Sequence, residues 1–79
     1  MSYIITLGAR YVARDYLDQY RCIDSLRPIY YDYGRAVCSD ALTFETEAAA
    51  KRYAQLNGLE FACVRTYDSC RNCIVRDGL

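Results

Sequence analysis

The chain has 79 residues, of which 53% are hydrophobic, and its ten basic residues balance its ten acidic ones. A domain of this size buries only roughly 60% of the surface that its unfolded chain exposes, which excludes a two-domain enzyme and a doubly wound nucleotide-binding fold. The zero net charge gives no overall field that would attract nucleic acid or an anionic membrane. We therefore expect one folded domain over residues 1–79.

The N-terminal residues predict a β-hairpin with strands over 3–7 and 10–14. Gly8 opens the two-residue connection between them, and glycine at that position favours a type II′ turn. Successive side chains of a strand point to opposite faces, so Ile4 and Ile5 place large apolar groups on both sides of the sheet. Both faces should therefore be covered.

The middle of the chain has two interpretations. Residues 15–26 carry apolar side chains at helical spacing, and Pro28 would end a helix that forms there. We predict a short second helix over 15–26, while the alternative continues the hairpin as an irregular strand. Residues 29–35 are typical of an extended or loop segment, and 36–38 of a further strand.

The second half contains the clearest helix signal. Thr46 is a good N-cap, Gly58 is a natural residue after the last turn, and the intervening segment is rich in alanine. These features predict a helix over 47–57. A short strand over 41–44 should lead into it.

A strand should follow the helix over residues 59–67, with Phe61 and Cys63 alternating with smaller side chains. Residues 68–79 are polar and rich in turn-forming types, so we expect a loosely docked tail.

These elements predict an α+β fold in which a small antiparallel sheet of about three to four strands packs against one main helix. A single helix covers only one face of such a sheet. The other face must be covered by residues 15–37, by a second copy of the chain or by a partner protein.

The sequence argues against catalysis and against a bound cofactor. It contains no histidine, the usual general base near pH 7, and no nucleophile or phosphate-binding motif. Cys70 and Cys73 have the spacing of half a zinc site, but Cys22, Cys38 and Cys63 supply no matching second pair. We expect no enzyme and no metal, with Cys70 and Cys73 as the ligands if zinc were bound.

Tyrosine and arginine are over-represented, with nine tyrosines and a single lysine, Lys51, among the basic residues. These two types are enriched at the energetic centres of protein interfaces, whereas lysine is depleted there. The partner-binding residues that we predict are Tyr30, Tyr31, Tyr33 and Arg35, followed by Tyr16, Tyr20 and Arg27.

The order of segments is similar to that of small phage-borne proteins. The sequence runs from YII through LTF to the capped helix TEAAAKRYAQLNG and the closing strand EFACVRTY. The pattern F-x-T/S-x-x-x-A around the helix resembles that of compact α+β anti-CRISPR proteins of bacteriophages and mobile elements. The resemblance covers residues 3–14 and 42–67, roughly half the chain, and gives no counterpart for the tyrosine-rich residues 16–35.

The resemblance implies a non-enzymatic inhibitor that binds a CRISPR effector complex in the cytoplasm of the host cell. One alternative is a small nucleic-acid-binding or regulatory module, stabilised by zinc in one version. Another is a homodimeric phage accessory or structural protein. We expect no contact with a membrane, because no apolar run approaches the about 18 residues that a span requires.

Overall fold

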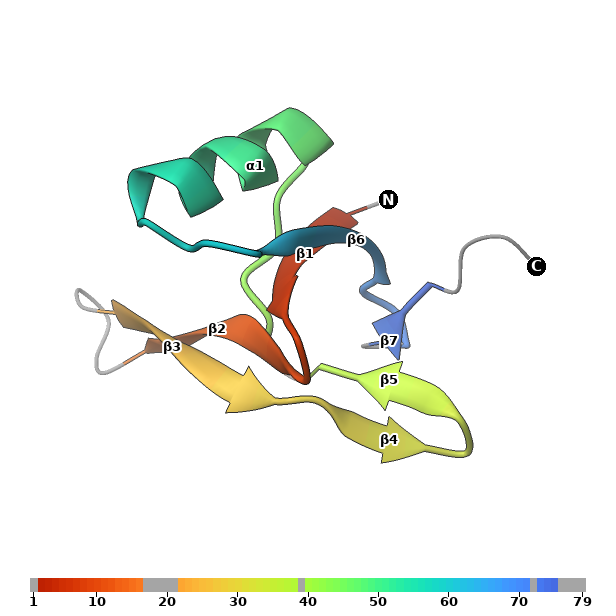
Figure 1. Cartoon of the computed structure of the whole chain (residues 1–79). Coiled ribbons are helices and arrows are strands. Elements are labelled where there is room, and N and C mark those ends of the chain that lie inside the picture. Colours follow the sequence, from red (N-terminus) through yellow and green to blue (C-terminus); the bar gives the residue numbers. More distant parts are fainter. Residues whose placement is uncertain (1, 17–21, 39, 72, 76–79) are drawn as a thin grey trace.

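The computed structural model describes residues 2–16, 22–38, 40–71 and 73–75. These residues form a seven-stranded antiparallel sheet and one helix (Figure 1). The predicted α+β fold, a sheet of about three to four strands on a main helix, is therefore wrong, since the fold is dominated by a curled sheet. In chain order, the elements are β1 (Ser2–Leu7), β2 (Arg10–Tyr16), β3 (Cys22–Pro28), β4 (Tyr30–Asp32), β5 (Arg35–Val37), α1 (Glu47–Leu56), β6 (Cys63–Asp68) and β7 (Cys73–Ile74).

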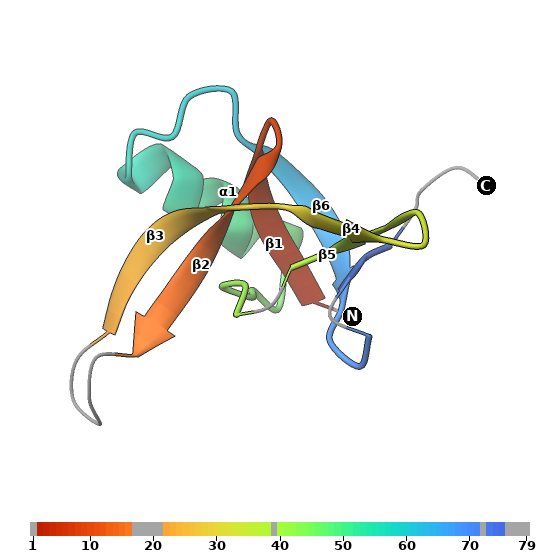
Figure 2. The ribbon, with the colours of Figure 1, turned by 90° about the horizontal axis from the view of Figure 1, so that it is seen from below.

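The two ends of the sheet are consecutive in the chain. The strand order is β3-β2-β1-β6-β7-β5-β4, and only Ile29 separates β3 from β4. Figure 2 shows β3 running directly into β4 along one bent path. At the bend, the Ile29 amide donates a hydrogen bond to the carbonyl of Ala9, with 2.7 Å between nitrogen and oxygen. The sheet curls because its two edge strands, β3 and β4, follow each other directly in the chain.

The predicted N-terminal hairpin is confirmed. β1 and β2 pair through Thr6 with Tyr11 and Leu7 with Arg10. Gly8 has a φ of 60°, in the left-handed region that glycine adopts without steric cost. The two-residue connection that the sequence predicts is therefore present.

The predicted helix over 15–26 is wrong. β2 continues to Tyr16 and β3 begins at Cys22, and the two strands pair over seven residues each, so the alternative of a continued hairpin is correct. Arg14 lies directly opposite Asp24, and their side chains form an ion pair with a nitrogen–oxygen distance of 2.9 Å. Opposite charges that face each other across an antiparallel pair of strands stabilise the sheet. The helical spacing of the apolar residues gives no sign of this cross-strand pair.

Apolar side chains form two core clusters on opposite faces of β1, as the sequence predicts. Ile5 belongs to the cluster beneath the helix, and Ile4 belongs to the cluster on the other face; both are fully buried. The first cluster consists of Ile5, Val12, Leu42 and Ala50, and the second of Ile4, Tyr11, Ala13, Cys38 and Tyr67.

The face of the sheet away from the helix is covered by the chain itself. Ile29, from the 15–37 segment, packs on the second cluster together with Ala41 and Ile74. The curl of the sheet brings these residues over Ile4. A second copy or a partner is not needed to cover this face.

The helix is confirmed over 47–56 with the predicted cap. Thr46 Oγ1 accepts a hydrogen bond from the Ala49 amide at 3.1 Å. Ala50 is fully buried, and the ring of Tyr53 packs against Phe44 with 5.4 Å between centroids. Alanine at the contact lets the helix lie close to the sheet, as small side chains do.

The strand after the helix is shorter than predicted. It begins at Cys63, because Phe61 has a φ of 62° and lies in a turn rather than in an extended strand. Phe61 is also 93% exposed, so its predicted place on a packed strand face is wrong. Residues 41–44 form only single bridges, Tyr3 with Phe44 and Ala13 with Ala41.

The C-terminal segment contributes to the sheet. β7 pairs with β6 through Tyr67 with Ile74, and with β5 through Val37 with Cys73. Cys73 is buried, so residues 73 and 74 are part of the fold rather than of a frayed tail. Within the described ranges, no helix combines the length and apolar character that crossing a membrane requires.

Three side chains in or beside the core should lose their protons only at high pH. Burial raises the pKa of the Tyr67 phenol from 10.0 to about 12 and that of the Cys38 thiol from 9.0 to about 11. Burial, followed by the Asp24 carboxylate, raises the pKa of Tyr53 from 10.0 to about 12.

A raised pKa in the folded state means that the unfolded chain releases these protons first. The free energy of unfolding should be unaffected by these groups below about pH 8, where the unfolded Cys38 thiol is still protonated, and fall as pH rises to about 12. Urea unfolding followed by circular dichroism across this range measures the loss. Tyr67→Phe removes one of the three groups and should make the fall shallower; an equally steep fall in that variant would contradict the assignment to Tyr67.

Candidate functional site

The β4–β5 hairpin carries the tyrosines that the sequence singles out. Tyr30 and Tyr31 are each 64% exposed, and Tyr33 is 94% exposed. Arg35 is also exposed, at the start of β5. The structure therefore brings the four leading predicted residues together on one hairpin. We call the exposed surface formed by Tyr30, Tyr31, Tyr33 and Arg35 the hairpin face; it includes both sides of the hairpin, because Tyr30 and Tyr31 project to opposite sides of β4.

The tip of the hairpin is strained. Tyr33 has a φ of 49° and Gly34 a φ of 77°, so both central residues of the two-residue turn are left-handed, as in a type I′ turn. Asparagine, aspartate or glycine normally occupies the first of these positions, because an aromatic side chain there is a conformational outlier. Tyr33 adopts this unfavourable conformation, and its ring is exposed to solvent. Strain of this kind is concentrated at functional sites.

A groove of about 580 Å³ runs beside the hairpin face. Its position follows from sheet register, since Tyr31 lies opposite Ala36 and Tyr67 lies opposite Ile74. The antiparallel pairing of Val37 with Cys73 then places Ala36 beside Ile74, so the groove crosses β4, β5 and β7 and reaches β6. We call this feature the arginine groove; its main side chains are Tyr31, Tyr33, Arg35, Arg65, Arg71 and Ile74.

Positive charge dominates the arginine groove. Asp68 is its one carboxylate among the described residues. That carboxylate accepts hydrogen bonds from the Cys70 and Arg71 amides at 3.0 and 3.3 Å, and it lies 3.9 Å from the Arg71 guanidinium. Arg35 and Arg65 form no ion pair with any residue that the structure describes. Two guanidinium groups are thus available to an anionic ligand.

Arg65 and Arg71 were missed in the sequence. They lie 30 and 36 positions after Arg35 in the chain, and only the long-range pairing of β5, β6 and β7 brings them near the hairpin. The alternation of the strand over 59–67 assigns side chains to faces, but it does not say which face meets the hairpin.

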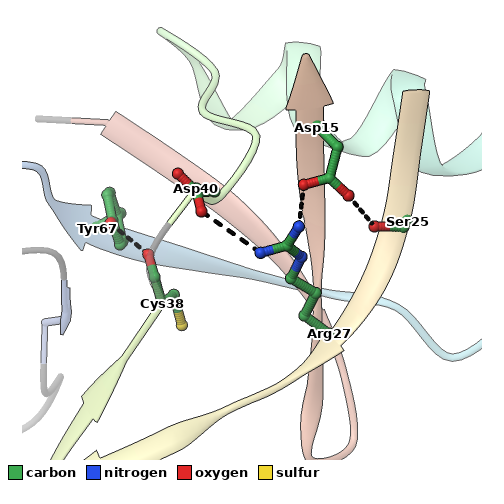
Figure 3. Close-up of polar contacts among 6 residues, drawn as sticks. All are labelled: Asp15, Ser25, Arg27, Cys38, Asp40 and Tyr67. Carbon is green, nitrogen blue, oxygen red and sulfur yellow. Dashed lines mark hydrogen bonds and ion pairs between the residues drawn. The ribbon is translucent and has the colours of Figure 1, made fainter. Parts of the chain in front are cut away.

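Arg27, also predicted as a contact residue, has partners inside the chain. Its guanidinium donates to Asp15 and, at 3.4 Å, to Asp40, and Ser25 donates to the other oxygen of Asp15 (Figure 3). These contacts join β2, β3 and the segment after β5. Arg27 therefore supports the sheet, and we leave it out of the hairpin face.

The remaining predicted residues divide into two groups. Tyr20 and the side chain of Tyr16 lie outside the described residues. Cys70 is exposed and Cys73 is buried, and the described residues contain no group of three or more histidine, cysteine, aspartate or glutamate side chains that could hold a metal ion.

Comparisons with known proteins identify no relative: no protein-family model matches the sequence, and neither the curated proteins nor the solved structures contain a significant match. The function is therefore argued from the hairpin face and the arginine groove.

Tyr33→Asn should stabilise the free protein. Asparagine tolerates the left-handed conformation and forms the preferred Asn-Gly type I′ turn, so the free energy of unfolding should rise by roughly 0.5–1 kcal/mol. Urea unfolding measures the change. Gly34→Ala is the matched control: it meets no neighbouring atom, yet its φ of 77° should cost about 1 kcal/mol. A loss of stability in Tyr33→Asn would mean that the ring packs on the fold.

Proposed function

We propose that this chain is a non-enzymatic protein-binding domain that acts by covering a surface of a larger protein complex. The hairpin face is its principal contact. One observation carries the proposal: three exposed tyrosines and an exposed arginine are held on a short hairpin whose tip places Tyr33 in solvent at a conformational cost.

The physical case for binding rests on exposed apolar area and rigidity. A tyrosine ring supplies a large contact area at a low cost in rotamer entropy, and arginine pairs with carboxylates through two parallel hydrogen bonds. A two-residue turn fixes the hairpin, so little backbone freedom is lost on binding. The same tyrosines contribute little to the cores of the fold, since none of the hairpin tyrosines belongs to either cluster.

The partner that we propose is a CRISPR effector complex of a bacterial host, which would make the chain an anti-CRISPR inhibitor acting in the host cytoplasm. This identity comes from the resemblance of the strand and helix segments and stays a prediction. The binding surface itself is proposed from the hairpin face, which lies outside the segments that carry the resemblance.

Affinity purification from a host lysate at physiological salt, followed by mass spectrometry, tests the proposal. The native chain should retain a protein complex, and a Tyr31→Ala/Arg35→Ala double variant should lose it. Leu56→Ala, which truncates a 76% exposed side chain on the helix, is the control and should retain it. Retention of no partner by the native chain, or of the same partner by the double variant, would overturn the proposal.

The arginine groove supports a second candidate function, binding of single-stranded nucleic acid. Tyrosine rings could stack on bases while arginines contact phosphates. Affinity for an oligonucleotide would then fall as salt increases, with a slope of log K against log salt concentration of about −0.7 for each phosphate contact. An affinity for oligothymidylate that does not change with salt would exclude this candidate.

A further inference from the structure

We propose that the arginine groove binds an extended acidic peptide segment of the partner, with Arg35 and Arg65 pairing with its carboxylates. This inference rests on the proposed protein-binding function and names the chemistry of the partner. It assigns a contact role to Arg65, which lies outside the hairpin face, and to the groove that Arg65 lines together with three residues of that face.

The first argument is charge. Arg35, Arg65 and Arg71 bring three guanidinium groups to the groove, and Asp68 offsets one of them. Asp32 lies opposite Arg35 in the sheet register, but no ion pair joins the two side chains in the described structure. The groove therefore has an excess of two positive charges on a chain whose net charge is zero.

The second argument is shape and polarity. Ala36, Ile74 and Val75 give the groove an apolar part between its arginines. Tyr31 and Tyr33 border it from the hairpin side. A volume of about 580 Å³ is in the range of roughly 300–1,000 Å³ that binding sites for ligands occupy. A peptide can place its backbone and aliphatic carbons on the apolar part while its carboxylates reach the guanidinium groups.

The third argument separates a peptide from a nucleic acid. A single strand requires a continuous row of positive charge, since it carries a phosphate at every nucleotide. Here a carboxylate interrupts the row, because Asp68 lines the groove beside Arg71. Two separated guanidinium groups suit separated carboxylates, each held in the planar fork geometry of an arginine–carboxylate pair.

Amide chemical shifts of the isotope-labelled full chain, followed during titration with decaglutamate at neutral pH, test the inference. Saturable shifts should be largest at Ala36, Arg65 and Ile74. Arg65→Gln should weaken binding about fivefold, which is the upper end for an exposed charge pair. Arg52→Gln makes the same charge change on an exposed helix position and should alter affinity less than about twofold. A dispersed spectrum for each variant shows that it is folded.

Three outcomes of the titration would overturn the inference. One is shifts scattered over all basic residues, and another is an equal loss of affinity in Arg65→Gln and Arg52→Gln, because both indicate unspecific attraction. The third is decathymidylate binding the groove more tightly than decaglutamate, which would assign the groove to nucleic acid.

Loss of partner capture in Tyr31→Ala with normal capture in Arg65→Gln would remove the groove inference alone. Peptide binding in the groove without any captured partner would remove the proposed function alone.

Discussion

Tyr67→Ala is expected to lower the free energy of unfolding by about 3–5 kcal/mol, as truncation of a buried aromatic side chain does. Tyr67 is 3% exposed and lies in the same cluster as Ile4, and its hydroxyl donates a 2.6 Å hydrogen bond to the carbonyl of Cys38. The substitution removes the ring from the second cluster and removes the hydroxyl that donates to the Cys38 carbonyl. Since small domains are stable by only about 5–15 kcal/mol, the variant should lose a large part of its stability.

Urea unfolding at 25 °C measures this loss, and Tyr67→Phe divides it into packing and hydrogen bonding. The phenylalanine variant keeps the ring and should lose about 1–3 kcal/mol, the cost of an unsatisfied buried carbonyl. If Tyr67→Ala cost less than about 1 kcal/mol, the second cluster would not be a core, and the curled sheet described above would be incorrect.

Tyr31→Ala and Arg35→Ala are each expected to weaken binding to the captured partner by about 2 kcal/mol, roughly 30-fold in Kd, because hot-spot residues at the centre of an interface have effects of this size. Both side chains are exposed in the free chain. The free energy of unfolding should therefore change by no more than about 0.5 kcal/mol.

Isothermal titration calorimetry measures the affinity, and a thermal melt of each variant measures stability. Leu56→Ala is the matched control, since it truncates an exposed apolar side chain on the helix and should change neither quantity. If Tyr31→Ala and Tyr33→Ala both melted far below the parent, the hairpin would be part of the core and the proposed contact surface would be misplaced.

Local signals in the sequence predicted the elements whose causes are local. The hairpin around Gly8 and the helix capped by Thr46 depend on residues within a few positions of each other, and both are present. The two apolar faces of β1 were also predictable, because alternation along one strand assigns Ile4 and Ile5 to opposite sides.

The fold class could not be read in the same way. Residues 15–26 include apolar side chains whose spacing fits a helix, but β2 and β3 pair over seven residues each, and cross-strand pairs such as Arg14 with Asp24 support that pairing. Tertiary pairing overrides local periodicity when the apolar run is short. Phe61 is a second example. Phenylalanine is a residue type that favours strands, but here its φ is left-handed and it lies in a turn.

The candidate site was predicted in part for the same reason. Tyr30, Tyr31, Tyr33 and Arg35 are neighbours in the sequence, so an exposed tyrosine-rich segment could be recognised before its structure was known. Arg65 meets them only through three strand pairings, and no local pattern encodes that meeting.

The pairing of distant strands in the curled sheet has a consequence for the order of folding. β2 and β3, and β4 and β5, are hairpins of neighbouring segments, whereas β1 pairs with β6 from Ser2 to Tyr67. Contacts between distant parts of a chain form slowly, because the entropy of closing a long loop is lost before the contact is gained. The β4–β5 pairing can therefore form before the long-range pairings, but the arginine groove exists only after β6 and β7 have joined the sheet. A nascent or partly unfolded chain would present the tyrosines and Arg35 without Arg65 and Arg71, which join them only in the native protein.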